Sequence, residues 1–123
     1  MKRALVIDDS RAMRMILARI LKDVGFDVLE AGHGKEALER LAGIRPPDLL
    51  MVDWNMPIMD GLALIKAVRA DRAYDVARIM MVTTETERAR VAEALGAGAN
   101  DYMMKPFTRD AVLAKLQLLG LVR

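Results

Sequence analysis

Residues 49–68 read LLMVDWNMPIMDGLALIKAV, and this stretch contains one complete structural unit. Leu49–Val52 is a short, fully apolar run, which is typical of a strand buried on both faces. Asp53 follows this run directly, and a loop begins at Trp54. Apolar residues then recur at helix spacing, at Leu62, Ile65 and Val68. The stretch therefore predicts a buried strand that ends in a carboxylate, followed by an amphipathic helix.

The same unit recurs along the whole chain. Four further apolar runs predict strands, at Ala4–Ile7, Val28–Leu29, Ile79–Val82 and Tyr102–Met104. Helical patterns lie between and after them, and we expect these helices to end at Gly25, at Gly43, and at Gly96 and Gly98, with Thr108 capping the last one. Five repeats of strand and helix predict an α/β fold, a parallel sheet with helices on both faces. Connections are short throughout, so we expect residues 1–123 to form a single domain.

Composition excludes several classes of site. The 123 residues are 54% hydrophobic and 29% charged, a balance typical of globular proteins, and the apolar runs are too short to span a bilayer. The N-terminus lacks the pattern of a signal peptide, so we expect a cytoplasmic protein. There is no cysteine, which excludes thiol catalysis, and the single histidine, His33, argues against a histidine-based metal site. We expect His33 in a surface loop, and Arg88 and Arg90 on a solvated helix face.

Polar residues directly follow four of the five predicted strands. They are Asp8 and Asp9, Asp53, Thr83 and Thr84, and Lys105. Ligands of open α/β sheets bind outside the carboxyl ends of the strands, so we expect these residues to converge. Three carboxylates in close proximity favour a cation, and an all-oxygen ligand set suits Mg²⁺ or Mn²⁺. A site that holds this cation together with a lysine, a hydroxyl and a free carboxylate suits a phosphoryl group. A carboxylate oxygen can then attack the phosphorus in line.

Each of these residues also has an ordinary structural explanation. Asp9 or Ser10 can cap the first helix. Thr84 can begin a capping box with Glu87, and Lys105 can be a solvated strand end. The functional interpretation depends on the coincidence of four such strand ends at one edge of one sheet.

Four motifs make the chain resemble bacterial two-component receiver domains, and most closely the single-domain chemotaxis response regulators. They are VIDDSRAMR at residues 6–14, MVDWNMPIMDGLALIK at 51–66, MVTTE at 81–85 and GANDYMMKPFT at 98–108. The resemblance covers essentially the whole chain. It implies a flavodoxin-like, doubly wound (βα)5 three-layer sandwich with strand order 2-1-3-4-5.

The resemblance also implies roles for the residues at the sheet edge. Mg²⁺ is expected to be held by Asp8, Asp9, Asp53 and the backbone carbonyl of Asn55. Asp53 is expected to accept the phosphoryl group, Thr83 to hydrogen-bond it and Lys105 to pair with it, with a cis bond between Lys105 and Pro106. The expected switch and partner face comprises Tyr102, Glu85, Val91, Leu95 and Lys115.

Two positions bear on the lifetime of the phosphoryl group. Asn55 and Glu85 match chemotaxis regulators at the positions two after Asp53 and two after Thr83, which implies a short-lived phosphoryl state. Thr84 departs from many relatives, which have Ala or Gly there. Its larger side chain is expected to restrict access to Asp53.

The resemblance implies a monomeric switch that contacts neither nucleic acid nor membrane. It would accept phosphoryl groups from a histidine kinase or phosphotransfer protein and act on a protein such as a flagellar motor switch protein. A receiver excised from a longer regulator, or a phosphoryl sink in a relay, remains an alternative. An enzyme acting on external phosphate esters would need an acid two residues after Asp53, where Asn55 stands, so we expect a phosphoacceptor that catalyses only its own phosphorylation and dephosphorylation.

Overall fold

The computed structural model describes residues 1–123, except for the side chain of Glu85, so the expected tuning and partner roles of that side chain lie outside the described residues. The strands are β1 (Arg3–Ile7), β2 (Asp27–Ala31), β3 (Leu49–Asp53), β4 (Arg78–Thr83) and β5 (Asp101–Met104). The α-helices are α1 (Arg11–Asp23), α2 (Gly34–Ala42), α3 (Gly61–Arg69), α4 (Val91–Ala97) and α5 (Arg109–Leu118). Two 3₁₀ helices, η1 (Arg72–Tyr74) and η2 (Glu85–Arg90), precede β4 and α4. The predicted alternation of strands and helices is confirmed.

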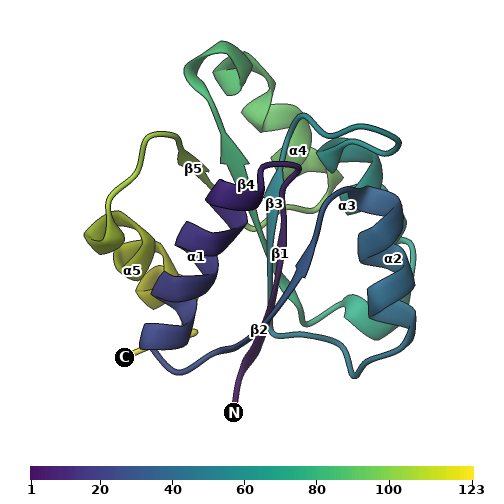
Figure 1. The fold of residues 1–123 in the computed structure, drawn as a ribbon. Helices are drawn as coiled ribbons and strands as arrows, with labels where there is room; N and C mark the ends of the chain where they lie inside the picture. Colours follow the sequence, from purple (N-terminus) through teal and green to yellow (C-terminus); the bar gives the residue numbers. More distant parts are fainter.

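The strands form one parallel sheet in the order β2-β1-β3-β4-β5, with helices on both faces. Helices α1 and α5 cover one face, and α2, α3 and α4 cover the other (Figure 1). This arrangement confirms the flavodoxin-like three-layer sandwich. Within the described part of the chain, none of the helices has the length and apolar character needed to cross a membrane.

The apolar strands are explained by two separate cores. Successive side chains of a strand point to opposite faces of the sheet. In β1, Leu5 and Ile7 pack on the side of α2 and α3, whereas Ala4 and Val6 pack on the side of α1 and α5. All four are fully buried. A strand covered on both faces must be apolar at every position, which is the pattern seen in the sequence.

The helix ends show which of the alternative explanations hold. Ser10, and not Asp9, caps α1, because its hydroxyl accepts a hydrogen bond from the backbone N–H of Met13 at 3.2 Å. Asp9 is exposed and is left for another role. Thr108 caps α5 as predicted. His33 is not a plain loop residue: its Nδ1 accepts from the backbone N–H of Glu36 at 3.1 Å and caps α2.

The region before α4 differs in part from the prediction. Thr84 does form a capping box with Glu87, but the turns that follow are the 3₁₀ helix η2, and α4 begins only at Val91. Gly96 lies inside α4 and does not end it, whereas Gly98 caps it with a φ of 122°. The Lys105–Pro106 peptide bond is cis, as the resemblance implied.

Candidate functional site

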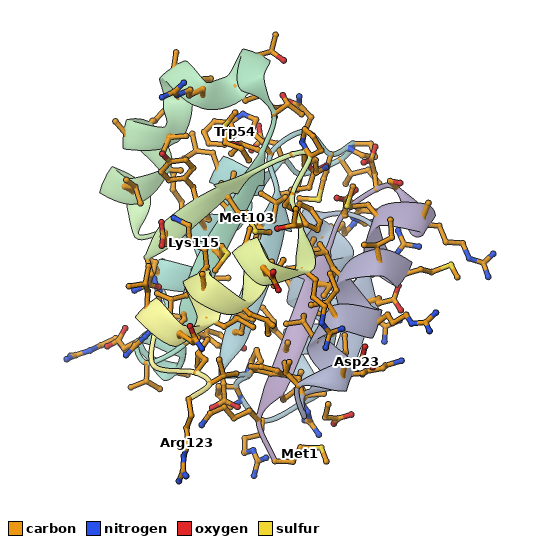
Figure 2. The ribbon with its side chains drawn as sticks, turned by 90° about the vertical axis from the view of Figure 1, so that its left-hand side faces the viewer. Met1, Asp23, Trp54, Met103, Lys115 and Arg123 are labelled. Carbon is orange, nitrogen blue, oxygen red and sulfur yellow. The ribbon has the colours of Figure 1, made fainter. Side chains whose placement is uncertain are left out.

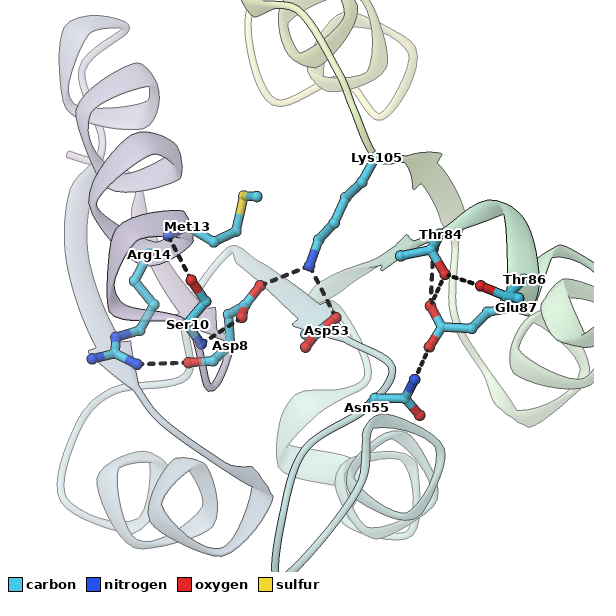
Figure 3. A network of polar contacts seen from close by, with 10 residues as sticks. All are labelled: Asp8, Ser10, Met13, Arg14, Asp53, Asn55, Thr84, Thr86, Glu87 and Lys105. Carbon is cyan, nitrogen blue, oxygen red and sulfur yellow. Dashed lines mark hydrogen bonds and ion pairs between the residues drawn. The ribbon is translucent and has the colours of Figure 1, made fainter.

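Asp8, Asp53 and Lys105 meet at the carboxyl edge of the sheet. Asp8 follows β1, Asp53 is the last residue of β3, and Lys105 follows β5. The Nζ atom of Lys105 lies 3.2 Å from Oδ2 of Asp8 and 3.2 Å from Oδ1 of Asp53 (Figure 3). The site lies between the neighbouring strands β1 and β3. The chain passes from β1 to β2 on one side and from β3 to β4 on the other, so this is the topological switch point of the sheet. Met1 and Arg123 lie at the opposite end of the molecule from Trp54, which follows Asp53 (Figure 2).

The three predicted acidic residues form one cluster. Asp8, Asp9 and Asp53 each offer a carboxylate oxygen, and these oxygens lie within 4.8 Å of one another. Asp8 is 1% exposed and Asp53 is 6% exposed, whereas Asp9 opens to solvent. Oxygen ligands at this spacing, with a solvent-facing side for water, fit Mg²⁺ better than a transition metal that prefers nitrogen or sulfur.

The turn that carries Asp8 is held by hydrogen bonds from both sides. Oδ1 of Asp8 accepts from the backbone N–H of Ser10 at 2.8 Å. The guanidinium of Arg14 donates to the backbone carbonyl of Asp8 at 2.7 Å and pairs with Glu30 at 3.2 Å. These contacts fix the Asp8 carboxylate while leaving Oδ2 for Lys105.

Burial and neighbouring charges shift the pKa values of both Asp53 and Lys105. Burial, together with the neighbouring Asp8 carboxylate, raises the pKa of Asp53 from 3.8 to about 6, although Lys105 acts in the opposite direction. Burial acts to lower the pKa of Lys105, but Asp53 and Asp8 outweigh it and the pKa is raised. Lys105 therefore stays charged at neutral pH. One ammonium group faces three carboxylates, which leaves a net negative pocket that favours a further cation.

The raised pKa of Asp53 predicts how stability depends on pH when no metal is bound. The folded state retains the Asp53 proton between about pH 4 and pH 6, whereas the unfolded chain has already lost it. The contribution of Asp53 to the free energy of unfolding is therefore largest below pH 4. It falls by about 3 kcal/mol in total as the pH rises to 6. Asp53→Asn removes the titrating group and should remove this loss.

Urea denaturation of the wild type and of Asp53→Asn in a chelator, at several values between pH 4 and pH 7, measures the effect. The other carboxylates titrate in both proteins, so their contributions largely cancel in the difference. The stability advantage of Asp53→Asn should grow with pH across this window. A difference that is constant with pH would contradict the raised pKa.

Thr83 lies beside the pocket but points elsewhere. Thr83 is fully buried, and among the described residues its hydroxyl contacts Sδ of Met104, at 3.6 Å, and not the carboxylates. Its backbone carbonyl accepts from the N–H of Lys105 at 2.6 Å. The structure therefore brings Thr83 next to Lys105 without placing its hydroxyl on Asp53 or Asp8.

Only part of the expected partner face is exposed to solvent. Tyr102 is half-buried. Nζ of Lys115, which is labelled in Figure 2, lies 5.1 Å from the centre of the Tyr102 ring. Lys115 also pairs with Asp101 at 3.0 Å. Leu95 is 41% exposed, but Val91 is only 8% exposed because it turns into the molecule at the start of α4. Val91 therefore offers a partner little surface, contrary to expectation.

Two contacts of Trp54 and Asn55, the residues that follow Asp53, were not predicted. The carboxylate of Glu87 accepts a hydrogen bond from Nδ2 of Asn55, which joins the loop after β3 to η2 (Figure 3). Arg90 is exposed, as expected, and its guanidinium also lies 4.4 Å from the centre of the buried Trp54 ring. The capping box predicted that Glu87 would be bound to Thr84, but no local pattern indicates a contact with a residue 32 positions earlier.

Known proteins resemble this chain in both sequence and structure. A profile of the response regulator receiver domain matches residues 4–117. The chain is 48% identical to the chemotaxis protein CheY1 of Helicobacter pylori over 93% of each chain, and 48% identical to a chemotaxis protein CheY homolog of Campylobacter jejuni over 92% of this chain and 88% of that one. The solved structure of the chemotaxis response regulator CheY4 of Vibrio cholerae superposes with a TM-score of 0.89 at 36% identity, covering 97% of this chain and 98% of that one. The chain therefore belongs to the family of response regulator receiver domains, as a CheY-type member.

Proposed function

We propose that the protein is a signalling switch in which Asp53 accepts a phosphoryl group from a phosphohistidine of a sensor kinase or phosphotransfer protein. The observation that carries this proposal is the position of the Asp53 carboxylate, which contacts Lys105 at 3.2 Å within a cluster of three carboxylates. Asp8 and Asp9 are then metal ligands and Asp53 is both ligand and nucleophile. Membership of the family supports phosphorylation-activated signalling.

The chemistry asks little of the protein beyond position and charge. An oxygen of the ionised Asp53 carboxylate attacks phosphorus in line, the P–N bond of the phosphohistidine breaks, and the imidazole nitrogen takes the electron pair. The Lys105 ammonium neutralises charge on the phosphoryl oxygens. Asp8, Asp9, Asp53 and the backbone carbonyl of Asn55 would hold Mg²⁺, which when bound supplies further positive charge. Such a cation also favours the ionised, nucleophilic form of Asp53.

The same residues provide a route from phosphorylation to a change of shape. A phosphoryl group adds negative charge and three strong acceptor oxygens. Among the described residues, the Thr83 hydroxyl bonds a sulfur acceptor at 3.6 Å, and because sulfur is a weak acceptor, a phosphoryl oxygen can attract the hydroxyl away from it. Movement of Thr83 frees space beside Tyr102, and the surface formed by α4, β5 and α5 then changes. A protein partner that prefers one shape reads the signal.

The direct test is phosphorylation of the intact chain. We expect a small phosphodonor such as acetyl phosphate, with Mg²⁺ present, to add one phosphoryl group, and peptide mapping by mass spectrometry to locate it at Asp53. A chain that stays unmodified, or is modified elsewhere, would contradict the proposal. Asn55, two residues after Asp53, lacks the acid that hydrolysis of external phosphate esters needs, so activity towards such substrates is not expected.

Mg²⁺ is expected to change the fluorescence of Trp54. Trp54 is 1% exposed, follows Asp53 directly and is the single tryptophan of the chain, so its emission reports the field at the acidic cluster. Titration with MgCl₂ should give a saturable change at millimolar concentrations, whereas NaCl of equal ionic strength should not. Asp8→Asn, which removes one proposed ligand, should weaken the response. An unchanged spectrum in the wild type would contradict the metal assignment.

The cognate partners remain predictions. We propose a histidine kinase as phosphodonor and a downstream protein, such as a flagellar motor switch protein, as target, and a monomer acting in the cytoplasm. Affinity of the phosphorylated and unphosphorylated forms for candidate targets tests the output. That residues 1–123 act without an output domain also remains a prediction. The length of the gene distinguishes this from a receiver within a longer regulator, and phosphotransfer assays would detect a phosphoryl sink.

A further inference from the structure

Glu87 is a buried acid that the proposed phosphoryl chemistry does not use. Glu87 is 6% exposed, and its two carboxylate oxygens accept hydrogen bonds from two different loops. Oε1 accepts from the backbone N–H and from the hydroxyl of Thr84, both at 2.9 Å. Oε2 accepts from Nδ2 of Asn55. A buried carboxylate requires such donors, so the whole side chain is committed to these contacts.

The two residues that Glu87 joins stand at the rim of the acidic pocket. Asn55 lies two positions after Asp53, and Thr84 directly follows Thr83 at the end of β4. Figure 3 shows both on the same side of Asp53, opposite Asp8, with Glu87 between them. Asn55 is exposed and Thr84 is half-buried. The Thr84 hydroxyl also lies 3.0 Å from the hydroxyl of Thr86, but Glu87 is the acceptor that Asn55 and Thr84 share, and without it the two side chains are no longer held relative to one another.

We propose that Glu87 is a positioning residue that holds the side chains of Asn55 and Thr84 as a fixed rim and thereby narrows the approach to Asp53. The inference rests on the proposed role of Asp53 as phosphoacceptor. The rim restricts the small phosphodonor during loading. It also restricts the water that later ends the signal, whose oxygen bonds to phosphorus while the acyl P–O bond breaks and its electrons return to the Asp53 carboxylate.

A rim of this kind leaves a kinetic signature that a general loss of structure does not. Both the donor and the attacking water approach phosphorus from the open side of the pocket. Freeing the rim therefore accelerates both loading and hydrolysis. A distorted site would instead misplace Lys105 and the acidic cluster, and loading would become slower.

Three substitutions distinguish the effect of the hydrogen bonds of Glu87 to Asn55 and Thr84 from the effect of its charge. Glu87→Ala removes both contacts, and Glu87→Asp keeps the charge but is one methylene too short to span them. We expect loading by acetyl phosphate and decay of the adduct after donor removal each to accelerate roughly three- to tenfold in both variants, as mass spectrometry of the intact chain measures. Glu87→Gln keeps the length, because its amide oxygen can accept from Thr84 and its NH₂ can donate to a rotated Asn55 amide. Its rates should stay near those of the wild type.

Glu93→Gln is the matched control. Glu93 lies in α4, is exposed and pairs with Arg90 at 3.6 Å, so its substitution removes a nearby charge without touching the rim. Its rates should equal those of the wild type. Rates in Glu87→Ala and Glu87→Asp that match or fall below the wild type would overturn the inference, and so would a Glu87→Gln variant as fast as Glu87→Ala. If Glu87→Ala fails to fold, Glu87→Asp and Glu87→Gln still decide. Failure of the wild type to form any adduct on Asp53 would instead contradict the proposed function itself.

Discussion

Asp53→Asn is expected to abolish incorporation of phosphate from acetyl phosphate in the presence of Mg²⁺. A neutral amide is a poor nucleophile where an ionised carboxylate oxygen is required. Removal of a catalytic nucleophile typically lowers a rate by about 10⁶-fold, so the adduct should fall below detection by mass spectrometry. An adduct that persists on this variant would show that Asp53 is not the acceptor.

This loss cannot be attributed to unfolding. Asn has nearly the size of Asp, and its amide oxygen can still accept from Lys105. The substitution also removes a charge whose burial raises the pKa of Asp53 to about 6, so the metal-free variant should be more stable than the wild type at neutral pH. The expected result is therefore a more stable protein that cannot be phosphorylated, and denaturation curves can be measured on the same samples.

Asp60→Asn provides the matched control for this substitution. Asp60 is exposed and caps α3, because its Oδ1 accepts from the backbone N–H of Ala63 at 2.9 Å. Asn caps helices about as well as Asp, so the fold should be unchanged. The Asp60→Asn variant loses one carboxylate from the same loop and should incorporate phosphate as the wild type does.

The sequence was most informative where strands are buried. The apolar run at Leu49–Val52 is typical of a strand covered on both faces, and a carboxylate that follows such a strand lies at the carboxyl edge of the sheet. Three such carboxylates and Lys105 could therefore be placed together before any coordinates were known. Their separation, and the commitment of Lys105 to both Asp8 and Asp53, required the structure.

The prediction was weakest between Thr83 and Gly98. The capping box of Thr84 and Glu87 marks a helix start, but η2 winds with about three residues per turn before α4 begins, which shifts the faces of the residues that follow. Val91 and Leu95 lie on one face of α4, four residues apart, yet Val91 is buried at the start of the helix and Leu95 is exposed one turn later. The contact between Glu87 and Asn55 depends on how two loops approach in space, and periodicity along one segment carries no information about that.

Gly61→Ala is expected to lower the free energy of unfolding by about 3 kcal/mol. Gly61 begins α3 and packs against the end of β3. An added Cβ would lie 2.4 Å from the backbone carbonyl oxygen of Asp53 and 2.8 Å from Cε of Met81. Met81 can move its flexible end, but the Asp53 carbonyl belongs to a strand paired with β4. The N–H of Gly61 is also bound to the carbonyl of Trp54 at 3.0 Å, so neither side of the contact can retreat freely.

Gly96→Ala isolates this contact from helix propensity. Gly96 lies within α4, and an added Cβ there would meet no atom within 4 Å. Propensity alone favours Ala over Gly by about 1 kcal/mol in a helix, so it predicts that both variants are stabilised. The close approach to Asp53 predicts instead a thermal midpoint about 10 °C lower for Gly61→Ala, and an unchanged or higher midpoint for Gly96→Ala.

The site should respond together with the fold, because the atom that the added methyl group of Gly61→Ala would displace is the backbone oxygen of the phosphoacceptor. Phosphate loading of Gly61→Ala, measured well below its midpoint, should therefore fall, while Gly96→Ala should load as the wild type does. A Gly61→Ala variant with the stability of the wild type would show that the loop between Asp53 and α3 has room to adjust. Stability that falls while loading stays normal would show that Asp53 keeps its position when the start of α3 moves. Only a joint loss supports the view that the close packing of α3 on β3 holds the Asp53 carboxylate in place.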